Sequence, residues 1–174
     1  MKKTFTILFS LIFVFSSCQT KEKIEDKEDY LRWIGDIEQN NEMDDTEFKA
    51  CMGDENILQY FHLQEGPMYY GEKPGIQNTF NTKYKPVTGN NQNGYIRIRF
   101  VVNCEGKAGR FRILQSDYDY NEIQFDESIV DQLLEITKGM ENWEILYGNE
   151  KIPIDYYLYL IFKINDGQIT EILP

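Results

Sequence analysis

The stretch from Gly94 to Gln115, GYIRIRFVVNCEGKAGRFRILQ, constrains the fold more than any other part of this chain. Apolar and polar side chains alternate through IRIRFV and again through RFRIL, with the period of two that is typical of a half-buried β-strand. Glu105 and Gly106 stand between the two runs and predict a two-residue turn. In that register inward positions face inward positions: Phe100 and Phe111, Ile98 and Ile113, Val102 and Gly109. The stretch therefore predicts an antiparallel hairpin with one apolar face.

The polar face of the same hairpin carries four arginines: Arg97, Arg99, Arg110 and Arg112. The register places Arg99 directly opposite Arg112, and like charges in that position destabilise a sheet. The arginine face therefore needs carboxylates, tyrosine rings or an anionic ligand beside it. Two interpretations are open. The chain's own carboxylates neutralise the face, or the face accepts an acidic segment of a partner.

A helix and a third strand follow the hairpin. In FDESIVDQLLEITKGM, Asp126 is a candidate N-cap and Gly139 a candidate helix end. One apolar stripe predicts that this helix covers the hairpin, and it consists of Phe125, Ile129, Leu133, Ile136 and Met140. Residues 157–165 alternate again and predict the last strand, whose second face carries tyrosines.

These elements predict an α+β fold, with a small antiparallel sheet packed on a helix. Upstream, GEKPGIQNTFNTKYKP predicts a helix that opens near Gly71 with Pro74 in its first turn. We expect residues 70–174 to form the main domain. Residues 30–69 would be a helical N-terminal extension, because apolar residues at its start recur at roughly helical spacing.

The N-terminus has the pattern of an export signal. Residues 1–17 contain two lysines, an apolar run too short to span a bilayer, and small residues at the end. The sequence Phe-Ser-Ser-Cys ending at Cys18 resembles a bacterial lipobox, with phenylalanine where leucine is usual. The resemblance implies that Cys18 is lipidated, and the alternative is a plain secreted protein. Residues 18–29 are almost wholly polar and predict a solvated tether.

These features predict a lipid-anchored protein of the cell envelope. The outer membrane is favoured, because Gln19 rather than aspartate follows the cysteine. Both the periplasmic and the surface leaflet stay open.

Charge excludes one class of partner. The formal net charge is −11, and the loss of Lys2 and Lys3 with the signal takes it to −13. A polyanion of this size repels nucleic acid at long range, so we expect no nucleic-acid partner.

Cys51 and Cys104 remain as an even pair once Cys18 is assigned to lipid. In an exported chain such a pair suggests a disulfide, and the alternative is two small buried apolar residues.

The sequence contains no motif that predicts catalysis or metal binding. His62 is the single histidine and has no nucleophile near it. DYDYNE, residues 117–122, begins like a calcium loop but lacks the glycine and the final glutamate of an EF-hand. We expect no enzyme activity, no cofactor and no metal.

Taken together, the elements from Gly94 onward resemble the C-terminal domain of TonB, the energy-transducing protein of Gram-negative envelopes. The resemblance rests on IRIRFVVN, EGK, RFRIL, FDESIVDQLLEI, Trp143, GNEK and YLIFKI, in that order. The stretch YYGEKPGIQNTFNTKYKP similarly looks like a helix that precedes the domain in Bacteroidetes relatives. Glu144 and Ile145 depart from the pattern, since lysine and proline follow the tryptophan in the family. The chain also lacks a transmembrane helix and a proline-rich spacer, so we do not expect an energy transducer.

The resemblance implies a binding mode in which the last strand pairs edge to edge with a peptide of a receptor. Carried over, the partner-binding edge would comprise Tyr157, Tyr159, Ile161 and Lys163. The partner would be another envelope protein or peptide, such as an outer-membrane receptor. The alternative is a structural lipoprotein whose edge is covered by its own chain or used to form a homodimer.

Overall fold

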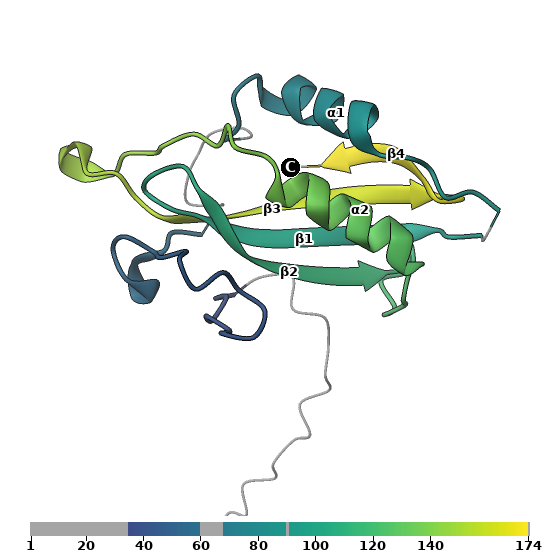
Figure 1. Cartoon of the computed structure of the whole chain (residues 1–174), viewed down its shortest axis with the longest axis horizontal. Helices are drawn as coiled ribbons and strands as arrows, with labels where there is room; N and C mark the ends of the chain where they lie inside the picture. The colour runs from purple at the N-terminus through teal and green to yellow at the C-terminus, as the bar shows by residue number, and fades with distance from the viewer. Residues whose placement is uncertain (1–34, 60–67, 90, 174) are drawn as a thin grey trace, which may run out of the picture. The chain divides into compact units, whose positions relative to one another are not determined.

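The computed structural model describes residues 35–59, 68–89 and 91–173 (Figure 1). These residues fall in one compact unit with an α+β fold. In chain order the elements are η1 (Asp54–Asn56), α1 (Glu72–Lys83), β1 (Gly94–Val102), β2 (Ala108–Ser116), α2 (Glu127–Lys138), η3 (Asn149–Lys151), β3 (Tyr156–Asn165) and β4 (Gln168–Leu173). The predicted signal, Cys18, the tether and His62 lie outside the described residues.

The four strands form one antiparallel sheet in the order β2-β1-β3-β4. β3 therefore lies inside the sheet, between β1 and the final strand β4 (Figure 1). At its start, β3 is bridged on the β4 side by Leu58, whose C=O accepts the N–H of Tyr157 at 2.8 Å. The prediction that residues 157–165 form the last strand is wrong, because one further strand follows and pairs with Ile161–Asn165.

The turn from β3 to β4 explains the extra strand. Asp166 and Gly167 form a two-residue connection in which both residues have positive φ, 46° and 69°. This conformation suits the twist of a tight hairpin, and an Asp-Gly pair adopts it readily. The chain therefore reverses at Asp166 and pairs Ile172 with Phe162.

The hairpin of β1 and β2 is confirmed, with one irregularity. Ile98 faces Ile113 and Arg99 faces Arg112 as predicted, but the register then shifts by one residue. Arg110, at φ 57°, is the extra residue of a β-bulge. Val102 consequently faces Ala108, and the prediction that it faces Gly109 is wrong.

The connection between these strands is also longer than predicted. Strand pairing stops at Val102 and resumes at Ala108, so five residues rather than two form the loop. Its ends are joined by the N–H of Asn103, which donates to the C=O of Lys107 at 2.9 Å.

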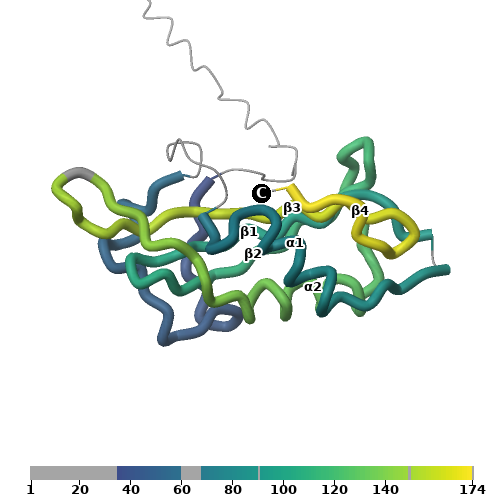
Figure 2. Tube along the Cα trace, turned by 90° about the horizontal axis from the view of Figure 1, so that it is seen from above, coloured from purple at the N-terminus to yellow at the C-terminus, as the bar shows by residue number. Residues whose placement is uncertain are grey.

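Both α-helices pack against one face of the sheet (Figures 1 and 2). The predicted caps of α2 are present, since the Asp126 side chain accepts the Ser128 N–H at 2.9 Å and Gly139 follows the last turn. α1 contributes Phe80, whose ring centroid lies 4.7 Å from that of Phe162 on β3. The main core thus lies between the helices and the sheet. It includes Ile96, Ile98, Phe100 and Leu160 of the sheet, Leu133 of α2, and Trp143 of the segment after α2.

The opposite face of the sheet is partly covered by residues 35–57, which we call the strap. Ile37, Phe48 and Ile57 of the strap form a second, smaller apolar cluster with Val101 and Tyr157. Within residues 35–59 the structure contains the single 3-10 turn η1 and no α-helix, so the predicted helical extension is wrong for this part. An irregular backbone leaves carbonyl groups free to accept hydrogen bonds from the sheet, whereas a helix would use them internally.

A glycine on β2 shows how closely the strap approaches. A Cβ atom on Gly109 would lie 2.3 Å from the ring of Phe48. Only glycine leaves room for that ring at this position.

No helix within the described part of the chain combines the length and apolar character needed to cross a bilayer.

Candidate functional site

The strap occupies the arginine face. Both side-chain nitrogens Nη1 and Nη2 of Arg112 donate to the carboxylate of Asp44, at 2.7 and 2.8 Å. Nη2 also donates to the C=O of Glu38 at 2.8 Å. A two-point guanidinium–carboxylate pair of this kind is both strong and geometrically specific. The opposed arginine, Arg99, donates to the C=O of Gly35.

Arg110 is buried against the strap. Its Nη2 lies 2.8 Å from Asp54 Oδ1, and its Nε donates to Gln39 Oε1 at 2.7 Å. Its side chain lies on the outer face with that of Arg112, beside Phe48 and Ile37. An isolated buried charge would be costly, and these contacts compensate for its loss of water.

The guanidinium of Arg97 lies over the ring of Tyr159. Its Cζ atom lies 4.2 Å from the ring centroid of Tyr159. Burial, together with the nearby charge of Arg99, lowers the pKa of Arg97 to about 10. Of the two interpretations left open by the sequence, internal neutralisation is the one that the structure contains, through Asp44, Asp54 and the tyrosines of β3.

The residues predicted to form a partner-binding edge lie on β3, which is inside the sheet and not at its edge. Tyr157, Tyr159, Ile161 and Lys163 lie on the outer face of a strand that has neighbours on both sides. The Tyr157 hydroxyl accepts the N–H of Ile37 at 3.3 Å, which ties this strand to the strap. The edge of β3 is therefore closed by β4 from Ile161 onward and by Leu58 at Tyr156 and Tyr157.

The Asp44 pair predicts a pH dependence of stability. The hydrogen bonds from Arg112 hold the pKa of Asp44 below its usual value near 3.8. A carboxyl whose pKa is lower in the folded state stabilises the fold above the unfolded pKa and loses that contribution as pH falls through the folded pKa. We expect Asp44→Asn to lower the unfolding free energy by about 1–3 kcal/mol at neutral pH. The gap from the wild type should close below about pH 4.

Chemical denaturation between pH 2 and 7 measures this gap. Asp45→Asn is the matched control, because Asp45 is the exposed neighbour and forms no ion pair among the described residues. A gap for Asp44→Asn that stays constant down to pH 2 would contradict the assignment.

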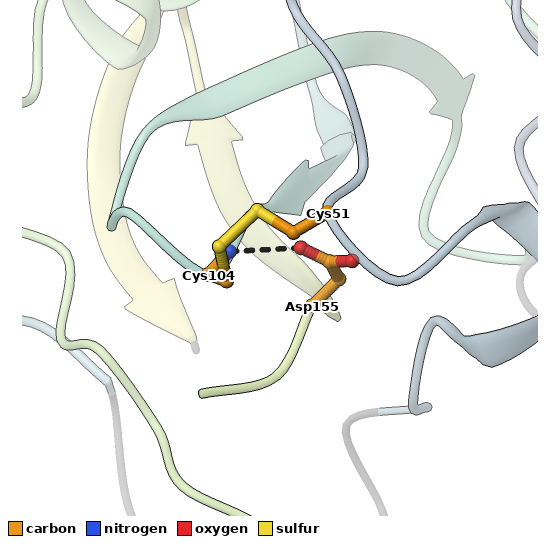
Figure 3. A group of neighbouring side chains, drawn as sticks. All are labelled: Cys51, Cys104 and Asp155. Carbon is orange, nitrogen blue, oxygen red and sulfur yellow. Dashed lines mark hydrogen bonds between the residues drawn. A yellow bond between two sulfur atoms is a disulfide. The ribbon is translucent and has the colours of Figure 1, made fainter. Parts of the chain in front are cut away.

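The disulfide that the sequence left open is present. Cys51 and Cys104 are joined, with a Cα–Cα distance of 6.0 Å, and the bond links the strap to the loop between β1 and β2 (Figure 3). The fully buried carboxylate of Asp155 lies beside it. Its Oδ1 accepts the Cys104 N–H and its Oδ2 accepts the Met52 N–H, both at 2.8 Å.

Cys51, Cys104 and Asp155 are also the one group of potential metal ligands within the described residues. The two sulfur atoms are bonded to each other, however, so they offer no thiolate to an ion. The carboxylate acts here as an acceptor for two backbone amides on either side of the crosslink. Sequence reasoning did not identify Asp155, because its partners lie 51 and 103 positions away.

A groove runs along the outer side of β2. One part, about 660 Å³ in volume, is lined by β2 from Ala108 to Leu114, by Met43–Asp45 of the strap and by Leu134 and Lys138 of α2. A second part of about 500 Å³ shares Asp45, Ala108 and Lys138 with the first and extends to the loop at Gly106. Both volumes lie in the range of ligand-binding sites.

The floor of the groove is the outer edge of β2, which is unpaired at Ile113. The Gln115 C=O accepts the N–H of Ile123, which shows that Gln115 directs its backbone groups away from β1. Alternate residues of a strand share this direction, so Ile113 and Phe111 also point outward. The Phe111 C=O accepts from the Arg112 side chain at 2.8 Å. For the outward groups of Ile113, the described part of the chain provides no hydrogen-bond partner.

A comparison of this chain with protein families, with curated proteins and with solved structures finds no match.

Proposed function

We propose that this chain is a lipid-anchored protein of the cell envelope that binds an extended segment of another protein along the outer edge of β2. The observation that supports it is the groove, whose floor offers the unpaired backbone groups of Ile113. An extended peptide that adds a strand to an open edge gains main-chain hydrogen bonds, and its alternate side chains fit the walls. The expected role is binding, without catalysis or energy transduction.

We further infer that the fold is of the TonB C-terminal type with one strand added. The order of hairpin, helix, Trp143 and strand supports this likeness. In this chain β4 pairs with the strand that the family uses for peptides, so binding shifts to the opposite edge.

The N-terminal sequence supports the anchor. The lipobox-like residues place a cysteine at position 18, ahead of a polar tether. Failure of Cys18 to incorporate labelled fatty acid in the native host would remove the anchor from this proposal.

The depth of the groove favours a single peptide over a second copy of the chain. The edge of β2 lies between Leu134 and Lys138 of α2 on one side and Met43–Asp45 on the other. If two copies paired through this edge, the α2 and strap residues of one copy would clash with those of the other. An extended peptide carries no such elements and can enter the groove.

Proline substitution tests which edge binds. Ile113→Pro removes an outward N–H on β2 without removing a bond to β1, so the sheet is preserved. Thr170→Pro is the matched control, since Thr170 lies on β4, the other outer strand, and is the residue left without a paired residue on β3 at the register shift. We expect peptides selected from a random library against the full chain to lose at least tenfold in affinity for Ile113→Pro and to keep it for Thr170→Pro.

The melting temperature and circular dichroism of both variants must first match those of the wild type. The reverse pattern, with loss at Thr170→Pro alone, would place binding on β4. If no peptide is selected at all, the alternative of a structural lipoprotein with self-covered surfaces is favoured. The strap, which covers the arginine face, supports that alternative.

A further inference from the structure

We infer that the peptide bound in this groove is basic at one end and apolar along the rest, a conclusion that rests on the proposed function. The evidence is an imbalance of charge along the groove. Four cations line it: Lys107, Arg110, Arg112 and Lys138. Four carboxylates line it as well: Asp44, Asp45, Glu47 and Glu141. By count alone, the groove would be neutral.

The cations, however, are already paired within the chain. Arg112 pairs with Asp44 at 2.7 Å and Arg110 with Asp54 at 2.8 Å. Lys107 lies 2.8 Å from Glu105, and Lys138 lies 3.7 Å from Glu135. Three of these four partner carboxylates stand outside the groove lining.

Three groove carboxylates are consequently left without a cation. Asp45, Glu47 and Glu141 are exposed and form no ion pair with any described residue. All three line the part of the groove next to the loop between β1 and β2. This end therefore presents uncompensated negative charge, which attracts lysine or arginine side chains.

The other end of the groove is apolar in character. Phe111 and Ile113 of β2 lie next to Leu134 of α2, and Met43 of the strap, two-thirds exposed, stands on the opposite wall. Side chains at alternate positions of an added strand point to the two walls in turn. Apolar residues at those positions fit this half of the groove.

The length of the groove sets the length of the peptide. Along β2 it follows seven residues, Ala108 to Leu114, or about 23 Å of extended backbone, and Gly106 and Lys107 of the preceding loop line its end. The occupant is thus an extended segment of about nine residues, apolar at alternate positions, with its basic residues beside Glu47 and Glu141.

Three synthetic nine-residue peptides test this specificity. All carry valine at alternate positions, and they differ only in two residues at one end, which are lysine, serine or glutamate. Fluorescence anisotropy of labelled peptides with the full chain gives the affinities. We expect the lysine peptide to bind roughly threefold to tenfold more tightly than the serine peptide, and the glutamate peptide to bind most weakly. The preference should fall as salt is raised.

Variants locate the charge effect. Glu47→Gln combined with Glu141→Gln should reduce the preference for the lysine peptide over the serine peptide to the part that Asp45 alone supplies. The matched control is Glu122→Gln with Glu171→Gln, which removes two exposed charges away from the groove and should keep the preference.

The outcomes separate the two ideas. Equal binding of all three peptides, abolished by Ile113→Pro, would overturn the charge preference and leave groove binding intact. Tightest binding of the glutamate peptide would overturn it as well. If none of the peptides binds, or if binding is indifferent to Ile113→Pro, peptide binding at β2 is itself wrong.

Discussion

Removal of the disulfide by Cys51→Ser and Cys104→Ser is expected to lower the unfolding free energy by about 4 kcal/mol. The bond closes a loop with a sequence separation of 53. In the chain-entropy description, a crosslink over a loop of this length restricts the unfolded chain by about that amount. A loss of this size is a large share of the stability of an ordinary domain, which is about 5–15 kcal/mol.

The strap should respond first. Without the crosslink, residues 35–57 are held on the sheet by the arginine contacts and the small apolar cluster. Hydrogen exchange should therefore accelerate most at the amides of Ile37 and Met52, and less in the core strands. Urea denaturation gives the global change.

A reductant provides the matched control. Because Cys51 is exposed, dithiothreitol should reduce the bond and destabilise the wild type by a similar amount. The double serine variant should show no response to the reductant. If the oxidised wild type and the double variant unfold at the same urea concentration, the crosslink contributes nothing.

Asp155→Ala is expected to lower the unfolding free energy by about 3–6 kcal/mol. The carboxylate is fully buried and accepts two backbone N–H groups, from Met52 and Cys104. Each hydrogen bond to a charged group contributes about 1.5–3 kcal/mol, and its loss leaves a donor without an acceptor. The same two amides flank the disulfide, so the substitution loosens the junction of strap and sheet from a second side.

Asp155→Asn keeps the shape of the side chain and removes its charge, so it measures the contribution of the charge alone. The amide retains one acceptor oxygen, so we expect roughly half the loss. Asp131→Ala, on the exposed face of α2, should change stability by less than about 0.5 kcal/mol. A cost for Asp155→Ala as small as that of Asp131→Ala would show that the buried carboxylate is dispensable.

The two substitutions should not be additive. Asp155 and the disulfide act on the same two segments of chain, and residues that share partners couple in double-mutant cycles. We expect the triple variant to lose less than the sum of the two separate losses.

The elements of regular periodicity were predictable from the sequence. The period of two in residues 94–102 and 157–164 arises because a sheet buries alternate side chains, and both strands are present. The apolar stripe of α2 and its Asp126 cap similarly predicted a helix that covers the hairpin. Such patterns are local, so they can be recognised in the sequence without knowledge of the tertiary structure.

The final strand was missed, although a signal for it exists. Asp166-Gly167 is a strong hairpin signal, and Ile169 and Ile172 follow it. The strand has only six residues, and Gln168, Thr170 and Glu171 make it look like a polar tail. The error mattered, because the predicted binding edge depended on the absence of this strand.

The candidate site was the least predictable part. The need for carboxylates near the arginines follows from charge alone, but Asp44 and Asp54 stand in an irregular segment without periodicity. The groove arises where strap, β2 and α2 meet, and no local pattern describes that meeting.

The order of the strands also affects the sequence in which parts of the domain fold. β1 and β2 are adjacent in the chain, whereas Phe100 on β1 pairs with Leu158 on β3 across a long intervening stretch. Contacts between distant residues form late, because the entropy of closing the loop must be overcome first. Cys51 and Cys104 both precede Asp155 in the chain, so their bond can form before Asp155 has been synthesised. The disulfide would then form before β1 pairs with β3, and the pairing of β3 and β4 would complete the sheet.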